Sequence, residues 1–495
     1  MIRSSLLLAA LACAPLTARG DEAAPNPPAP RVTERGAVRA SWKVPGAPKW
    51  GNMNAPALAD FDGNGRKTIV LAVSGQGPSL AEGGQLLAWD ATGRVREGFP
   101  VPVACDGHAD VGRLGLPTLA DLEGNGKDNV LLPALWGASW GNRFVFIVDG
   151  YGQEWPIPLD TGVDLTTAVA PVVDLENTGI FTILAGQTLA PTLGPSRPLR
   201  RWTSERPLHG YAPCIGDADG DGHVEVFQPE YDKLYHIQPN PPDAHLLQGF
   251  DSTGRSLPGW PQRVSNVVLN PVMGDTQGNG TSQIFVANNA FLLAWTWQGQ
   301  PLPGSQTVGE LSSVWKQARP GAGFLNVSLA DLDGDARAEV LSVCNDGWLY
   351  AWRGDGSGVR APDGRFAFVN GSLFAGNGDG TLMSEAGDAV VADLNDDGEP
   401  DIFWGNRWLT LHADGRLEET RMSPDDGINV SLADLDGDGR AQAVFLTTKG
   451  ELVVYDTGMK WPRHGAQWPT TRGNWQRTGA WVDPMKRRTR DAKAN

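Results

Sequence analysis

The chain has 495 residues, and its 62 glycines and 37 prolines together make up about a fifth of it. Both residues disfavour helix interiors, by roughly 1 kcal/mol for glycine and roughly 3 kcal/mol for proline, so a mainly helical protein is excluded. Hydrophobic residues make up 41% of the chain and 19 residues are tryptophan, which excludes a disordered protein. The formal net charge of −16 argues against a nucleic-acid partner, because phosphate backbones attract basic surfaces.

The first 20 residues have the features of a secretory signal peptide. Arg3 gives a short basic start, residues 5–16 are mostly apolar, and Ala18-Arg19-Gly20 is a small-x-small cleavage site. In an alternative reading, Ala10 to Cys13 form a lipoprotein box in which Cys13 is acylated. We therefore expect a secreted, periplasmic or extracellular protein, either free or tethered through Cys13.

The segments next to the ends of the chain differ in composition from the rest. Residues 21–45 begin with a run rich in proline and predict a linker, and residues 481–495 predict a basic C-terminal tail. No later stretch is apolar over the ~18 residues that a membrane-spanning helix needs. The folded region is therefore expected at residues 46–480.

An internal repeat is the strongest signal in the sequence. The string NVSLADLDGD occurs at residues 326–335 and again at residues 429–438. A looser pattern, Dx[DN]xDG with acid or amide substitutions after an apolar run, occurs eight times, opening at Asp60, Asp121, Asp174, Asp217, Asp275, Asp331, Asp393 and Asp434. The mean spacing is about 53 residues, close to the ~40–50 residues of propeller-blade repeats.

Each copy predicts about four short antiparallel strands. In the sixth copy, residues 327–330, 340–343 and 348–352 are strand-like, with the acidic loop between the first two and a hairpin at residues 354–356. Four strands cannot bury both of their faces alone, so neighbouring copies must stack, and a radial arrangement closes them into a ring. The fold class is all-β, a β-propeller of about eight four-stranded blades.

The repeats resemble the FG-GAP/VCBS family, whose propellers occur in the head of integrin α-chains and in secreted bacterial proteins. The resemblance rests on the segments PALADFDGNG, GDADGDGHVE, SLADLDGDAR and VADLNDDGEP, and on aromatic third strands such as GWLYAW. It covers about residues 50–460. Seven blades are familiar in that family whereas this chain has eight loops, so seven blades is the alternative. The segments WDATG…GFP and WPTTRGNWQRTGAW also resemble the blades of quinoprotein propellers.

The acidic loops predict calcium sites, because Ca²⁺ takes six to eight oxygens and carboxylates at alternate loop positions converge on one point. The best-equipped loops are the fourth (Asp217, Asp219, Asp221 and Glu225), the sixth (Asp331, Asp333, Asp335 and Glu339), the seventh (Asp393, Asn395, Asp397 and Asp401) and the eighth (Asp434, Asp436, Asp438 and Gln442). The first (Asp60, Asp62 and Asn64) and the second (Asp121, Glu123 and Asn125) have two carboxylates each and predict weaker binding. The third and fifth loops are expected to keep only the turn. In the alternative reading, Asp and Gly serve all eight loops as turn residues and no ion is needed.

Two classes of function compete. The family resemblance implies a non-enzymatic, calcium-stabilised propeller that acts in binding, adhesion or scaffolding toward a protein or glycan partner, and we expect a monomer. The alternative is an enzyme on the same scaffold, a polysaccharide lyase or a quinone-dependent dehydrogenase. A lyase would place a Lys, Arg or His beside an accessible calcium loop. No catalytic residue is assigned from the sequence.

Overall fold

A computed structural model describes a large part of the chain. The described residues are 27–45, 55–73, 84–103, 111–136, 141–154, 159–165, 171–174, 182–183, 192–193, 197–198, 212–230, 246–264, 270–288, 290–309, 311–320, 322–369, 388–470, 472–474, 476, 478 and 480–481. The expected signal peptide, Cys13 and nearly all of the basic tail lie outside them.

The fold is all-β and consists of several small sheets that follow one another along the chain. The first sheet has the order β3 (Ala57–Ala59), β4 (Thr68–Val73), β5 (Gly84–Trp89) and β6 (Val101–Val103). In the second, β7 (Val111–Leu114) and β8 (Thr118–Ala120) both pair with β9 (Asn129–Trp136), followed by β10 (Gly141–Val148) and β11 (Leu159–Leu165). Two short pairs come next, β12 (Val172–Val173) with β13 (Thr182–Ile183), and β14 (Thr192–Leu193) with β15 (Arg197–Pro198).

Three sheets make up the middle of the chain. One has the order β16 (Cys214–Gly216), β17 (Glu225–Glu230), β18 (Leu246–Phe250) and β19 (Gln262–Arg263). The next has the order β20 (Val272–Gly274), β21 (Gln283–Asn288), β22 (Phe291–Thr296), β24 (Leu311–Gln317) and β23 (Gln306–Val308). The third has the order β25 (Phe324–Ala330), β26 (Glu339–Cys344), β27 (Trp348–Trp352) and β28 (Arg365–Phe368).

The last two sheets each include a strand from the N-terminal part of the chain. One contains β29 (Val390–Ala392), β30 (Asp401–Trp404), β31 (Arg407–Leu411) and β32 (Leu417–Arg421), with the 3₁₀ turn η3 (Leu394–Asp396) after β29 and β1 (Arg31–Val32) parallel to β32. The other contains β33 (Gly427–Ala433), β34 (Arg440–Thr447) and β35 (Glu451–Lys460), with β2 (Ala37–Lys43) antiparallel to β35. The expected linker at residues 21–45 therefore includes two strands. Pairing with an open sheet edge orders them, which the composition of the segment could not show.

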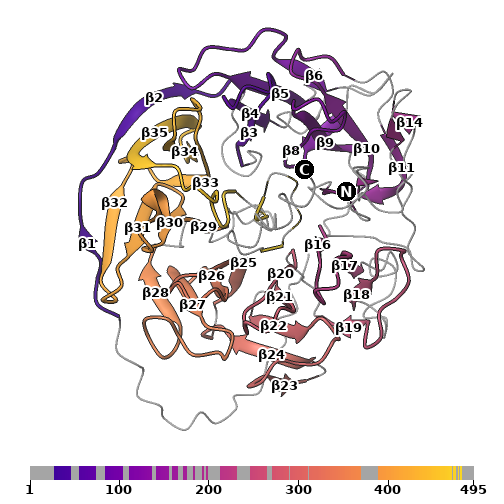
Figure 1. Ribbon diagram of the computed structural model, residues 1–495, viewed down its shortest axis with the longest axis vertical. Coiled ribbons are helices and arrows are strands. Elements are labelled where there is room, and N and C mark those ends of the chain that lie inside the picture. Colours follow the sequence, from indigo (N-terminus) through magenta and orange to yellow (C-terminus); the bar gives the residue numbers. More distant parts are fainter. Residues whose placement is uncertain are drawn as a thin grey trace, which may run out of the picture.

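The sheets lie around a common centre, with β3, β8, β20, β25, β29 and β33 innermost (Figure 1). Several strands, among them β4, β21 and β26, are buried at every residue, because neighbouring sheets cover both of their faces. The last sheet also packs on the first, where Leu446 and Val444 share an apolar cluster with Leu58 and Leu71. The core is thus distributed between the sheets.

The C-terminal segment, residues 466–481, runs across the inner strands of several sheets. Trp468 exchanges two backbone hydrogen bonds of 3.0 Å with Val391 in β29, and its side chain is fully buried. Farther along, backbone N–H groups of β12, β16 and β33 donate to carbonyls of the segment, and Trp481 donates to Met273 in β20. The guanidinium of Arg472 is buried and donates to the carbonyls of Pro213 and Pro271. The segment therefore joins sheets that lie far apart in the sequence.

Candidate metal centre

In each described acidic loop the carboxylate of the first aspartate accepts backbone N–H groups of the same loop. The donors are the fifth and sixth loop positions in the first, second, seventh and eighth loops, and the fourth and sixth positions in the fourth and sixth loops. In the first loop, Asp60 accepts from Asn64 (3.1 Å) and Gly65 (2.8 Å), and in the eighth loop Asp434 accepts from Asp438 (3.0 Å) and Gly439 (2.7 Å). These contacts explain why the loop needs an aspartate even where no ion binds, because a short carboxylate satisfies several turn amides at once.

The ninth position of the loop also has a structural role. Its side-chain oxygen accepts the N–H of the second position, for Glu225 from Ala218 (2.7 Å) and for Glu339 from Leu332 (2.6 Å). Amide side chains do the same elsewhere: Asn129 accepts from Leu122 (3.1 Å), Gln283 from Thr276 (2.7 Å) and Gln442 from Leu435 (2.8 Å). The structure shows that this position is a hydrogen-bond acceptor in these five loops, and in the fourth and sixth loops its carboxylate also belongs to an acidic cluster.

Loops of neighbouring sheets are also bonded to one another. The N–H of the eighth position donates to a carbonyl at the start of the preceding loop, from Ser282 to Ala218 (2.8 Å) and from Ala338 to Asp275 (2.9 Å). The same bond runs from Asp128 to Asp60 (2.9 Å) and from Lys67 to Leu435 (2.8 Å), which joins the eighth loop to the first. In the seventh loop the eighth position is Pro400, which has no N–H to donate.

Within the described part of the chain, acidic side chains come together in two loops. In the fourth loop, carboxylate oxygens of Asp217, Asp219 and Glu225 lie within 4.8 Å of one another. In the sixth loop, those of Asp331, Asp333 and Glu339 do the same. In both loops the fifth-position aspartate, Asp221 or Asp335, accepts the N–H of the seventh position instead (2.7 and 2.9 Å). Two oxygens coordinated to one Ca²⁺ at about 2.4 Å lie at most about 4.8 Å apart. The oxygen spacing in both clusters is within this limit, so each could hold a metal ion.

Both clusters contain a buried glutamate whose charged form is disfavoured. Glu339 is only 1% exposed, and burial, aided by the charges of Asp333 and Asp331, raises its pKa to about 8. Burial likewise raises the pKa of Glu225 to about 7, again with a contribution from the neighbouring aspartates. A cation between the carboxylates would remove this penalty, since it replaces the lost hydration of the charges.

The first and second loops use their acids for other contacts. Asp62 receives two hydrogen bonds from the guanidinium of Arg96, at 2.7 and 3.1 Å. Glu123 accepts from the amide of Asn125 at 2.7 Å. Neither loop joins three acids in one cluster within the described residues.

The seventh loop differs from the expectation in its backbone. Asn395 adopts a positive φ of 72°, and its amide oxygen accepts from Lys460 N (2.7 Å). Asp401 is buried and accepts from the indole N–H of Trp408 (2.6 Å) and from Thr410 (2.5 Å). Burial raises the pKa of Asp401 to about 7. Within the described residues the three acids of this loop, Asp393, Asp397 and Asp401, do not form one cluster.

In the eighth loop, one of the expected ligands is paired with a residue from the expected linker. Arg39 in β2 forms a two-pronged ion pair with Asp436. Asp434 and Asp438 accept loop amides, and Gln442 brings no charge. In the fifth loop, Asp275 accepts N–H groups from Gly278 (2.7 Å) and Gly280 (2.8 Å), as expected for a turn without an ion. The third loop lies almost wholly outside the described residues.

Comparisons with known proteins reveal similarity in structure alone. No family model and no curated protein significantly matches the sequence. Among solved structures, a rhamnogalacturonan lyase of Bacillus licheniformis is similar at 14% identity and a TM-score of 0.49, covering 86% of this chain and 76% of that one. BBS1N, crystallised in complex with ARL6DN, is similar at 11% identity and a TM-score of 0.44, covering 88% and 98%. The biofilm matrix protein Bap1 of V. cholerae is similar at 12% identity and a TM-score of 0.40, covering 91% and 97%.

In the described residues no helix has the length and apolar character to cross a bilayer.

Proposed function

We propose that the protein is a secreted, calcium-stabilised β-propeller of eight blades, of the FG-GAP/VCBS type, that serves as a non-enzymatic binding module. The observation that carries the metal part is the pair of carboxylate clusters in the fourth and sixth loops. Asp217, Asp219 and Glu225 would hold one ion, and Asp331, Asp333 and Glu339 the other. A bound Ca²⁺ supplies positive charge at buried carboxylates and ties two strands of a sheet together.

The arrangement of the loops supports the closed propeller. The inter-loop hydrogen bonds link the first loop to the second, the fourth to the fifth, the fifth to the sixth and the eighth to the first. The innermost strand of the last sheet, β33, contacts the innermost strand of the first sheet, β3. The fifth loop is hydrogen-bonded to both the fourth and the sixth loop. Ions in the fourth and sixth loops would therefore stabilise three consecutive sheets.

The metal part is tested by thermal unfolding of the full chain. We expect calcium to raise the melting temperature relative to chelator, since a ligand at 100 times its Kd stabilises the folded state by about 2.7 kcal/mol per site. Asp401→Asn is the matched control, because Asp401 has a raised pKa but lies outside both clusters. Its response to calcium should equal that of the native chain. An unchanged melting curve in calcium would overturn the metal part.

The binding part is tested by a screen of glycans and surface proteins, with and without calcium. The lyase alternative requires a basic side chain beside the metal. This side chain must be free to interact with the acidic sugar of the substrate. Arg353 is next to the sixth cluster, but its Nε donates to Asp333 at 3.1 Å. His223 in the fourth loop and Arg337 in the sixth loop are exposed basic side chains that a lyase could use. We favour the non-enzymatic module on the resemblance of the repeats, and release of unsaturated uronate from a polysaccharide would reverse that choice.

A further inference from the structure

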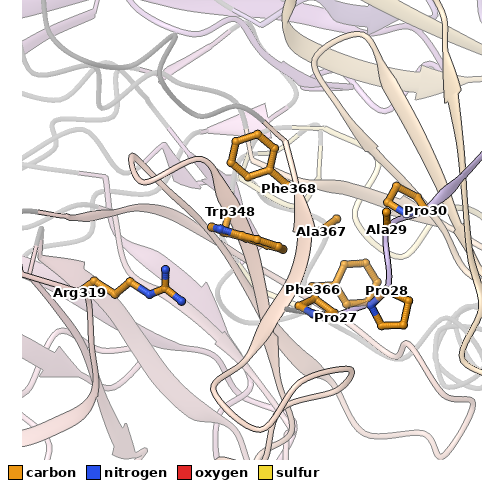
Figure 2. A pocket seen from close by; sticks show the side chains of 9 residues that line it. All are labelled: Pro27, Pro28, Ala29, Pro30, Arg319, Trp348, Phe366, Ala367 and Phe368. Atoms are coloured by element: carbon orange, nitrogen blue, oxygen red, sulfur yellow. The ribbon is translucent and has the colours of Figure 1, made fainter. Parts of the chain in front are cut away.

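The outer strands β27 and β28 have an aromatic surface that lies against the proline-rich N-terminal segment, residues 27–30 (Figure 2). Trp348 from β27 and Phe366 and Phe368 from β28 line one side of a cavity of about 630 Å³, and the segment lines the other. The rings of Trp348 and Phe368 meet edge to face at 5.4 Å. Phe368 remains 50% exposed, unusually high for a large apolar side chain on a strand.

The segment is buried with a period of three residues. Pro27 and Pro30 are half-buried, whereas Pro28 and Ala29 between them are exposed. The polyproline II helix has three residues per turn, so residues i and i+3 lie on the same face. The segment also has no regular hydrogen-bonded secondary structure, as polyproline II requires. Burial and sequence thus agree on a P-x-x-P segment whose two outer prolines are its more buried residues.

The side chain of Arg360 contacts the backbone of the segment. Arg360 Nη2 donates to the carbonyl of Pro28 at 3.1 Å. The same guanidinium is fixed from the other side, because its Nη1 donates to the carbonyl of Phe366 at 2.6 Å and it lies 5.7 Å from the centre of the Phe366 ring. Carbonyls of a polyproline II helix have no partner within the helix, so the Pro28 carbonyl is free to accept from an arginine fixed in this way.

We propose that this surface, the proline groove, is a binding site for proline-rich peptides in the polyproline II conformation, and that Pro27 and Pro30 occupy it as an internal ligand. The proline groove is defined by Trp348, Arg360, Phe366 and Phe368. Aromatic grooves bind such peptides well because the peptide is already ordered before it binds. The cavity that remains beside the segment shows that four residues do not fill the groove.

The internal segment sets the conditions under which a partner binds. A tethered ligand has an effective concentration in the millimolar range, so it competes strongly with a peptide in solution. If the free peptide binds the empty groove with a Kd about a tenth of that concentration, the segment weakens external binding roughly tenfold. The groove would therefore accept a proline-rich partner only when the partner is multivalent or the segment is displaced.

The test measures binding of a fluorescent peptide, residues 24–31 of this chain, to full-length protein by fluorescence anisotropy. We expect Pro27→Ala/Pro30→Ala to bind the peptide at least tenfold more tightly than the native chain. Adding Phe368→Ala to that variant should abolish the gain, and a peptide with alanine in place of its prolines should not bind. Equal binding to the native chain and the double variant, or no binding to either, overturns the proposal, provided that both melt at the same temperature.

A second measurement needs no change in the segment. Phe368→Ala in the otherwise native chain should release residues 27–30 and increase the rate of trypsin cleavage after Arg31. Phe368 is half exposed, so this substitution leaves the core intact. An unchanged cleavage rate would show that the aromatic ring does not hold the segment, and would contradict the proposal even if the double variant failed to fold.

Discussion

Substituting Glu339 by Gln separates the two roles of the sixth loop. Glutamine retains the acceptor for Leu332 N, as Gln283 and Gln442 show at 2.7 and 2.8 Å in their own loops. The substitution therefore preserves the turn and removes a single carboxylate. Any change in stability reports on charge and metal binding.

Without metal, we expect Glu339→Gln to stabilise the protein. Burial raises the pKa of Glu339 from its ordinary 4.5 to about 8, so near neutral pH the folded protein holds a proton that the unfolded chain has released. A raised pKa gives stability that is complete below about pH 4.5 and is lost as pH rises toward 8. At about pH 7 the loss spans some 2.5 pH units, or roughly 3 kcal/mol at about 1.4 kcal/mol per unit. Glutamine does not titrate, and the metal-free variant should gain up to that amount.

With calcium in excess, the sign should reverse. The variant lacks one ligand, and each tenfold loss of affinity removes about 1.4 kcal/mol of the stabilisation by calcium. Denaturant unfolding of the two proteins, each in chelator and in calcium, measures both effects. Asp414→Asn, in an exposed hairpin turn outside the loops, is the control and should change neither. If Glu339→Gln destabilises the protein equally in both conditions, the glutamate is a turn residue and the metal account of this loop is refuted.

Three further predictions concern the rest of the account. Gly98→Ala should cost about 3 kcal/mol in the free energy of unfolding, because an added Cβ would lie 1.9 Å from the Tyr151 carbonyl of the next sheet. Gly65→Ala, with a similar positive φ and open space around it, should cost only about 1–2 kcal/mol by the same denaturant assay. Arg472→Met should lower stability by roughly 2–5 kcal/mol, since it leaves two buried carbonyls unpaired, and a change below 1 kcal/mol would mean that the C-terminal segment contributes little. Finally, the rise in melting temperature caused by calcium should be larger at about pH 8 than at about pH 5.5, because protons compete with the ion for the two buried glutamates, and no pH dependence would contradict their role as ligands.

Repeat spacing and turn chemistry together predicted much of the fold. The loop that opens at Asp331 is flanked by strands at 324–330 and 339–344, and the third strand lies at 348–352, where the aromatic run predicts it. Local sequence suffices there because each strand pairs with the next one along the chain.

Contacts between segments far apart in the chain could not be predicted from local sequence. The pairing of β2 with β35, and of Arg39 with Asp436, depends on an open sheet edge more than 390 residues away. The buried role of residues 466–481 depends on carbonyls that the inner strands of several sheets present together. The sequences of β2 and of residues 466–481 contain no pattern that identifies these contact partners.

The candidate site was predictable only in part, for a similar reason. The eight loops have nearly the same sequence pattern but different neighbours in the fold. Asp62 therefore accepts a hydrogen bond from Arg96, and Asp401 accepts one from Trp408. One signal was readable in the sequence: the ninth position is an amide in three loops, an acid in three others and threonine in the remaining two. A position that varies among amide, acid and hydroxyl side chains indicates a hydrogen-bond acceptor first and a ligand second.

The central claim is most directly tested by counting bound calcium. We predict that full-length Asp219→Asn/Asp333→Asn binds two fewer calcium ions per chain than the native protein in equilibrium dialysis against labelled calcium, one for each acidic cluster. An equal number of bound ions in the two proteins, or none in the native chain, would contradict the account.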